Sequence, residues 1–236
     1  MHVKAVLFDL DGTLLDTLED IANSANGALI RYGLPTNEVD AYRYFIGDGV
    51  TMLISRALPA EKRDSDIIAK CVKGFREDYS RNWNVNTRPY GGVGELLNSL
   101  TAKRIKMAVL SNKPDDFTKQ CVSALLPNHN FEMILGQRHG IPIKPDPVGA
   151  LQIADNLGIA PSQFLYLGDS AIDMQTAVRA GMFPVGALWG FRTLEELQEY
   201  GAQAVIERPM DLLGLLDASC WPKKSWASST DAVRLI

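Results

Sequence analysis

Short apolar runs that end in polar or turn residues, separated by stretches with helical spacing, constrain the fold of this chain most. Four runs are apolar on both sides, as in the strands of a buried parallel sheet, and two more are weaker. The four cover residues 3–8, 105–111, 164–169 and 183–188, and the weaker pair covers 131–136 and 202–207. Helical spacing fills the intervals at 93–100, 117–125, 148–157 and 174–178. The alternation predicts an α/β fold with a doubly wound, Rossmann-like parallel sheet.

One long interval, residues 17–86, breaks this alternation and carries only helical signals. Thr17 and Gly33 are predicted to begin and end its first helix. Because this insert directly follows the first strand, we expect an all-α cap that covers the carboxyl edge of the sheet like a lid. The predicted parts are a core of residues 1–16 and 87–217, a helical cap of residues 17–86, and a C-terminal tail of residues 218–236, either free or docked.

Two aspartates stand where the first strand ends, in the sequence FDLDGTLLDT. Asp9 and Asp11 are two residues apart, and residues at this spacing on an extended chain point to the same side. Two carboxylates this close repel each other, so either one takes up a proton or a cation neutralises them. Mg²⁺ is the cation that suits such oxygen ligands. The alternative is a strand that merely leaves the sheet through an Asp-Gly turn.

A second acidic pair follows another apolar run, in the sequence YLGDSAID. Asp169 ends this run, and Asp173 lies in the following turn or helix start. Because the carboxyl ends of parallel strands meet at one edge of a sheet, the two acidic pairs can converge on one metal ion. The alternative is that Asp169 or Ser170 serves only as a helix N-cap.

Two further loops offer groups suited to an anionic ligand. Ser111 and Asn112 directly follow a predicted strand, where a hydroxyl and backbone N–H groups near a helix start could hold phosphate oxygens. Lys144 lies in the loop GIPIKPDP, whose three prolines restrict the backbone. We expect the Lys144 ammonium to be held in place, and a solvated surface lysine is the alternative.

Composition limits the partners of the chain. With 46% hydrophobic residues, 22% charged residues and a net charge of −4, it is typical of a globular protein. No basic or arginine-rich stretch stands out, which argues against nucleic acid. No apolar stretch suits a signal peptide or a membrane span, so we expect no membrane partner and a cytoplasmic location.

In their order along the chain, four features resemble the motifs of the haloacid dehalogenase superfamily. They are DLDGT at residues 9–13, SN at 111–112, Lys144 and GDSAID at 168–173. The resemblance spans about residues 3–216 and implies a Rossmann-like core with an inserted cap. The segments FIGDGVTMLISRAL, SNKPDDF and KPDP are similar to the phosphoglycolate phosphatase branch in particular.

This resemblance implies a role for each motif. Asp9 would attack the phosphorus and form an aspartyl-phosphate, while Asp11 would protonate the leaving alkoxide and later deprotonate water. Ser111 and Lys144 would hold the oxygens of the transferred group. The metal ligands implied for Mg²⁺ are the Asp9 side chain, the backbone carbonyl of Asp11, Asp169 and Asp173, the last directly or through water.

Further residues are predicted to lie near the substrate. Asn112 would contact phosphate, and Thr13 would chiefly orient the Asp11 loop. Gly47 and Gly49 are predicted to form the substrate loop of the cap, because residues without side chains let backbone N–H groups approach a ligand; a simple interhelical turn is the alternative. Arg56 could meet a substrate carboxylate, although an exposed helix position is the favoured interpretation.

These roles imply a Mg²⁺-dependent phosphatase that hydrolyses a small phosphorylated metabolite and acts as a monomer or homodimer. The leading substrate is 2-phosphoglycolate. Alternatives are a β-phosphoglucomutase-like phosphomutase, a pyrophosphatase and a sugar phosphatase. The dehalogenase and phosphonatase branches are disfavoured because they lack the second acid, which is present here as Asp11. A non-catalytic regulatory protein is the least favoured hypothesis, since the acidic motifs are intact.

Overall fold

The computed structural model describes residues 2–216 and 233–235. Its main sheet has the strand order β5-β4-β1-β6-β7-β8-β9, and the strands from β5 to β8 are parallel. All six predicted strands are present, so the doubly wound α/β fold is confirmed. They are β1 (Ala5–Phe8), β4 (Lys106–Pro114), β5 (Met133–Gln137), β6 (Phe164–Gly168), β7 (Phe183–Ala187) and β8 (Ala204–Ile206).

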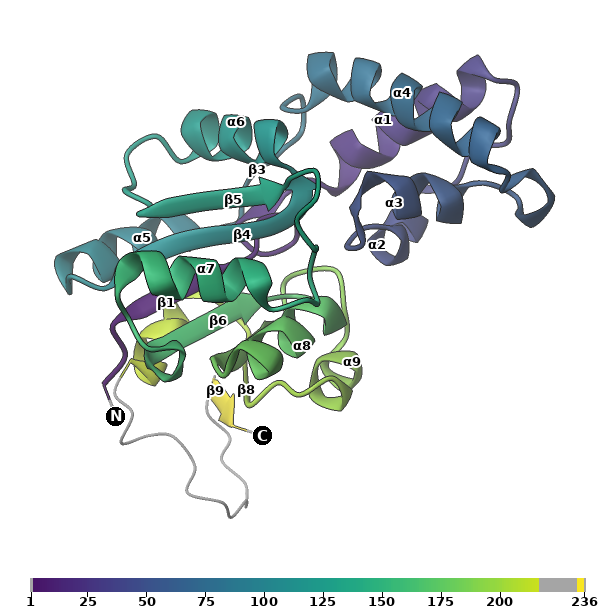
Figure 1. Ribbon diagram of the computed structural model, residues 1–236. Helices are drawn as coiled ribbons and strands as arrows, with labels where there is room; N and C mark the ends of the chain where they lie inside the picture. The colour runs from purple at the N-terminus through teal and green to yellow at the C-terminus, as the bar shows by residue number, and fades with distance from the viewer. Residues whose placement is uncertain (1, 217–232, 236) are drawn as a thin grey trace.

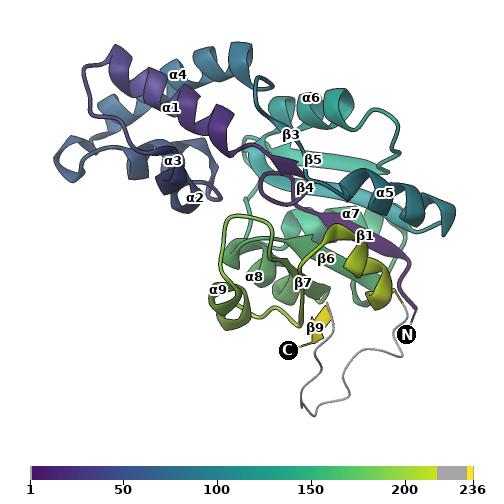
Figure 2. The ribbon, with the colours of Figure 1, turned by 180° about the vertical axis from the view of Figure 1, so that it is seen from behind.

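Helices cover both faces of this sheet (Figure 1, Figure 2). One face carries α5 (Val93–Ala102) and α6 (Asp115–Leu125), and the other carries α7 (Val148–Leu157) and α8 (Ala171–Ala180). The short helices α9 (Leu194–Glu199), η3 (Pro161–Gln163) and η4 (Pro209–Leu215) complete the core. Alternate residues of β1 join different hydrophobic clusters, Val6 and Phe8 on the α5 and α6 side, Ala5 and Leu7 on the other. Both faces of β1 are therefore buried, as its apolar run predicts.

The central strand β1 lies between β4 and β6, and it ends beside both of them, with β4 continuing past it to Pro114. Phe8 is paired with Val109 of β4 and with Leu167 of β6. The strand order reverses at β1, which is the place where open parallel sheets bind ligands beyond their carboxyl ends. The residues that follow β1, β4 and β6 are therefore brought together at one edge.

The cap is the insert that leaves the core after β1. Figure 1 shows its α-helices grouped at the carboxyl end of the sheet. Its chain enters and leaves through a two-stranded antiparallel ribbon, β2 (Leu15–Asp16) and β3 (Arg88–Pro89). The helices are α1 (Leu18–Arg31), α2 (Tyr42–Phe45), α3 (Gly49–Ala57) and α4 (Ser65–Asn82), with η1 (Val39–Ala41) and η2 (Ala60–Lys62) between them. The predicted all-α insert is present, and α1 packs along α4.

The two ends of α1 differ in how well the sequence predicts them. Gly33 has a φ of 68°, and its N–H donates to the carbonyl of Ile30, so the predicted stop is confirmed. Thr17 occupies the N-cap position, but its side chain accepts no hydrogen bond from the first turn. The predicted start of the helix is therefore confirmed, but without a side-chain hydrogen bond at the cap. Asp20, the third residue of the helix, is bound by another part of the chain.

Asp20 joins the two connections of the cap. Its carboxylate is 2% exposed and accepts hydrogen bonds from the backbone N–H and side chain of both Asn86 and Thr87, at 2.7 to 3.0 Å. These two residues lie where the chain returns from α4 to β3. One buried carboxylate thus fixes the return of the chain against the first turn of α1.

Replacing Asp20 with alanine is expected to lower the free energy of unfolding by about 3 kcal/mol. The substitution leaves the buried hydroxyl and N–H of Thr87 without their acceptor. Urea denaturation would measure the change, with Glu19→Gln as the control because Glu19 lies on the same turn and is exposed. Equal midpoints for the two variants would contradict the role given to Asp20.

Part of the predicted tail belongs to the sheet. β9 (Val233–Leu235) pairs antiparallel with β8 and forms the edge strand. The rest of the predicted tail, residues 218–232 and 236, lies outside the described residues. Among the helices that the structure describes, none combines the length and apolar character needed to cross a bilayer.

Candidate active site

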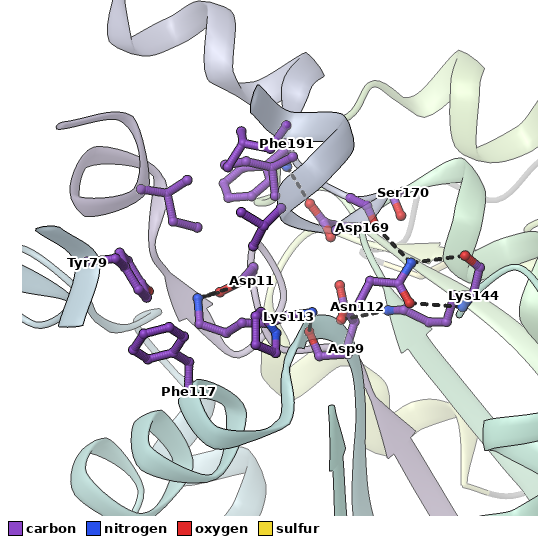
Figure 3. Close-up of a pocket in the computed structure, with 18 of the residues that line it drawn as sticks. Asp9, Asp11, Tyr79, Asn112, Lys113, Phe117, Lys144, Asp169, Ser170 and Phe191 are labelled. Carbon is purple, nitrogen blue, oxygen red and sulfur yellow. Dashed lines mark hydrogen bonds and ion pairs between the residues drawn. The ribbon is translucent and has the colours of Figure 1, made fainter. Parts of the chain in front are cut away.

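A cavity lies between the carboxyl end of the sheet and the cap (Figure 3). The core lines it with polar residues from the segments after β1 and β6 and from the end of β4, and the cap lines it mainly with apolar side chains. The core residues include Asp9, Asp11, Ser111, Asn112, Lys113, Lys144 and Asp169, and the cap residues include Ile21, Ile46, Gly47, Gly49, Val50, Leu53, Phe75 and Tyr79. Most of the predicted site residues are therefore gathered around one space.

Three carboxylates form a buried acidic cluster at this edge. One oxygen each from Asp9, Asp169 and Asp173 lies within 4.8 Å of the other two. Ligands on opposite sides of a Mg²⁺ ion are about 4.2 Å apart, twice the usual ligand distance, so this spacing is close to that of a shared ion. The two acidic motifs, far apart in sequence, do converge.

Lys144 is the counter-charge of the acidic cluster. Its Nζ lies 2.7 Å from an oxygen of Asp9 and 2.7 Å from an oxygen of Asp173, and its side chain is 4% exposed. Burial by itself would lower the pKa of Lys144, but Asp173 and Asp9 outweigh it and raise that pKa well above its usual value. Lys144 is thus a held cation, not a solvated surface lysine.

One lysine does not balance three acids. Burial, reinforced by Asp173, raises the pKa of Asp9 well above its usual range in spite of Lys144. Burial and Asp173 also raise the pKa of Asp169 to about 7. With all four groups ionised, three carboxylates and one ammonium carry a net charge of −3 + 1 = −2. A divalent cation matches both this charge and the all-oxygen donor set, so the residues present fit Mg²⁺.

Asp169 is held by close backbone contacts. One of its oxygens accepts a 2.7 Å hydrogen bond from the N–H of Phe191, and the other accepts one from the hydroxyl of Thr13 at 3.3 Å. A Cβ on Gly12 would lie 2.3 Å from an Asp169 oxygen, and a Cβ on Gly190 would lie 2.3 Å from the Asp169 Cβ. Thr13 is fully buried, donates to Asp169 and is not among the residues that line the cavity, so a place beside the substrate is not supported for it. Its predicted role of orienting the Asp11 loop stays a prediction.

Asp173 is the most enclosed member of the acidic cluster. One of its oxygens accepts from Lys144 and from the Tyr166 hydroxyl, and the other accepts from the backbone and side chain of Ser170. Ser170 and Asp173 form a reciprocal capping box at the start of α8. Ser170 is therefore the predicted N-cap, while Asp169 and Asp173 also belong to the acidic cluster.

Asp11 faces a different partner from Asp9. The Nζ of Lys113 lies 3.0 and 3.3 Å from the two oxygens of Asp11, and the Lys113 side chain is 4% exposed (Figure 3). Sequence reasoning assigned Lys113 no role. The available signal was its position two residues after Ser111 on the extended end of β4, which aims both side chains to one side.

Ser111 and Asn112 differ in what their side chains do. Ser111 lines the cavity, and its Oγ accepts a hydrogen bond from the N–H of Lys113. The Asn112 amide donates to the carbonyls of Gly47 and Lys144 and accepts from the Lys144 N–H, each at 2.9 Å. These bonds occupy the amide that was predicted to contact phosphate. Asn112 instead ties the Lys144 loop to the cap.

The predicted cap residues fall into two groups. Gly47 and Gly49 line the cavity with φ values of 132° and 81°, conformations that favour glycine. Arg56 pairs with Asp48 at 2.5 Å and donates to the carbonyl of Phe45, and it is not among the residues that line the cavity. The hypothesis that Arg56 meets a substrate carboxylate is therefore not supported.

Comparison with known proteins agrees with this geometry. The family model described as haloacid dehalogenase-like hydrolase matches residues 6–187. The chain belongs to this family. The predicted resemblance to the phosphoglycolate phosphatases of this family is confirmed. The predicted enzyme class, phosphoric monoester hydrolase, is confirmed as well.

Relatives in the family cover nearly the whole chain. A phosphoglycolate phosphatase of Aquifex aeolicus is 33% identical over 91% of this chain and 97% of its own length. An N-acetylmuramic acid 6-phosphate phosphatase of Pseudomonas aeruginosa is 29% identical over 92% of this chain and 96% of its own length. The crystal structure of a predicted phosphoglycolate phosphatase from Haemophilus somnus has a TM-score of 0.85 and 30% identity, and the match covers 91% of this chain and 98% of that one.

Proposed function

We propose that this chain is a Mg²⁺-dependent phosphatase that hydrolyses a small phosphomonoester through an aspartyl-phosphate on Asp9. The convergence of Asp9, Asp169 and Asp173 around Lys144, with Asp11 beside them, carries this proposal. All of these residues except Asp173 line the cavity below the cap, and the cap would shield the reaction from bulk water.

Asp9 would act as the nucleophile. It directly follows the central strand, lines the cavity and pairs with Lys144 at 2.7 Å, a contact that helps to orient its carboxylate. Attack of one carboxylate oxygen on phosphorus breaks the bond to the leaving oxygen, and the phosphoryl group becomes bonded to Asp9. Water then attacks the same phosphorus and releases inorganic phosphate, so one difficult displacement is divided into two.

Asp11 would move the protons. Its carboxyl would give a proton to the leaving alkoxide in the first step and take one from the attacking water in the second. Ser111 and Lys144 would donate to oxygens of the transferred group, whose charge shifts in the transition state. Asn112 and Thr13 support these residues indirectly through Lys144 and Asp169.

Mg²⁺ would be held by Asp9, the backbone carbonyl of Asp11, Asp169 and Asp173. When bound, a divalent ion offsets the negative charges of the carboxylates and the phosphate, which otherwise repel each other. Because each oxygen of Asp173 already accepts two hydrogen bonds, whereas each oxygen of Asp169 accepts one, a contact through water suits Asp173 better than a direct one.

The leading substrate remains 2-phosphoglycolate. The similarity to phosphoglycolate phosphatases supports it, and the relative that acts on N-acetylmuramic acid 6-phosphate keeps sugar phosphates as an alternative. A phosphomutase and a pyrophosphatase also remain alternatives. A cytoplasmic location and a monomeric or homodimeric state remain predictions.

A panel of phosphorylated metabolites, assayed for phosphate release with Mg²⁺, would test the proposal. Phosphate release from a phosphosugar with no isomer formed would count against a phosphomutase. No phosphate release from any member of the panel would contradict the proposed function and favour a non-catalytic protein.

The packing around Asp169 makes a further prediction. Gly190→Ala is expected to lower kcat about a hundredfold and to raise the Mg²⁺ concentration needed for half-maximal rate, because the new Cβ displaces Asp169. Gly94→Ala is the control, since a Cβ there meets nothing within 4 Å. Equal Mg²⁺ dependence in the two variants would contradict this account of Asp169.

A further inference from the structure

Lys113 is the cation of the cavity that the mechanism leaves without a role. Among the described residues that line the cavity, positive charge is carried by Lys113, Lys144 and Arg192. Lys144 is divided between two carboxylates of the acidic cluster. Arg192 donates to two backbone carbonyls of the cap and pairs with Glu196. Only Lys113 combines an ammonium in the cavity with a single described counter-ion, Asp11.

The surroundings of Lys113 favour binding of an anion. Its Nζ lies 4.6 Å from the centre of the Tyr79 ring, and Tyr79 and Phe117 stand beside it as apolar walls (Figure 3). An ammonium has three N–H donors, and the Asp11 carboxylate together with the Tyr79 face leaves donor capacity for a ligand. Charge interactions are stronger against such walls than in water.

The position of Lys113 relates it to the leaving group. A leaving oxygen that takes a proton from Asp11 must lie within hydrogen-bond distance of the Asp11 carboxyl. Lys113 contacts the same carboxyl at 3.0 Å. A charged substituent one or two carbons from that oxygen would therefore come within reach of the Lys113 ammonium. Part of the remaining wall on the cap side is apolar, formed by residues such as Val50, Leu53 and Phe75.

We propose that Lys113 binds a carboxylate on the leaving group and thereby selects phosphorylated acids over neutral phosphomonoesters. The inference rests on the proposed phosphatase function and assigns a specificity residue within it. Lys113 would thus have the role considered for Arg56 from the sequence, contact with a substrate carboxylate, since Arg56 is paired with Asp48.

The test compares two esters that differ only in charge, 2-phosphoglycolate and its carboxamide, 2-phosphoglycolamide. The wild-type kcat/KM is expected to be about ten to a hundredfold higher for the acid. Lys113→Met is expected to bring this ratio close to one, and Lys113→Arg, which keeps the charge, to retain a clear preference. Lys119→Met is the matched control, because Lys119 is exposed on α6 and pairs only with Asp115 among described residues.

The ratio separates two roles of Lys113. If Lys113 acts only through Asp11, Lys113→Met slows both esters equally and the ratio stays at the wild-type value, which would overturn the inference. A wild-type enzyme that turns over both esters equally would overturn it as well, with no variant needed. That second measurement decides the matter if Lys113→Met does not fold, as judged by circular dichroism.

Failure of the proposed function looks different. Wild-type protein that hydrolyses neither ester, nor any other phosphomonoester, would refute the phosphatase function and the inference with it. Hydrolysis of both esters without a charge preference would refute the role of Lys113 alone.

Discussion

Replacing Asp9 with asparagine is expected to lower kcat for phosphomonoester hydrolysis by about 10⁴-fold or more. The amide has nearly the shape of the carboxylate but lacks the anionic oxygen that would attack phosphorus. Asp9 is also the partner of Lys144, at 2.7 Å, but Asp173 keeps this lysine in place at the same distance. The loss of kcat should therefore come from the missing nucleophile more than from a change in the geometry of the site.

A second readout distinguishes a nucleophile from a residue that only binds. Acid quench of wild-type enzyme turning over ³²P-labelled substrate should trap labelled protein that loses its label in alkali, as an acyl phosphate does. Asp9→Asn should show no label. Asp11→Asn should still become labelled, with kcat lowered about 10²- to 10⁴-fold because proton transfer is impaired. Asp9→Asn protein within tenfold of the wild-type rate would refute the assignment.

The local pattern of apolar residues was sufficient to predict the core of the fold. The run at residues 3–8 is apolar on both sides, and β1 is buried on both faces. Parallel strands bring their carboxyl ends to one edge, so Asp9 and Asp169 could be placed together before any contact was known. The pair of Asp169 and Asp173 is visible as a local motif, whereas its meeting with Asp9 follows from the topology of the sheet.

The contacts that the sequence did not reveal are long-range or made by backbone. The hydrogen bond from Asn86 to Asp20 joins residues 66 positions apart, and the ion pair of Asp11 and Lys113 joins residues 102 positions apart. Phe191 holds Asp169 through its N–H, a group that almost any residue supplies, so no pattern marks this position. Thr17 is followed three residues later by Asp20, the spacing typical of a helix cap, yet Asp20 is bound by the returning chain instead.

Asn112 shows another limit of prediction from sequence motifs. The residue lies at the predicted strand end, but its side-chain amide makes three hydrogen bonds to the backbone of Gly47 and Lys144. A motif identifies which residues gather at a site. It does not say which of their polar atoms stay open to a ligand, because that depends on how neighbouring loops pack.

Removal of divalent metal with a chelator is expected to abolish activity, and added Mg²⁺ is expected to restore it. The physical reason is that the acidic cluster and Lys144 carry a net charge of −2 when all four groups are ionised, and this charge repels an anionic phosphate when no cation offsets it. Activity alone does not show where the ion binds, so a measurement of stability is needed beside it. A ligand that binds only the folded state stabilises it by about 2.7 kcal/mol at a hundred times its dissociation constant.

Mg²⁺ should therefore raise the melting temperature of the wild-type protein in the absence of substrate. Asp169→Asn is expected to lose most of this rise together with at least a hundredfold in kcat, because one ligand and one negative charge are removed from the acidic cluster. Asp155→Asn, on the exposed side of α7, should keep both the rise and the activity. If Asp169→Asn kept the full Mg²⁺-dependent rise, the ion would bind elsewhere, and the shared-ion account of Asp9 and Asp169 would be wrong.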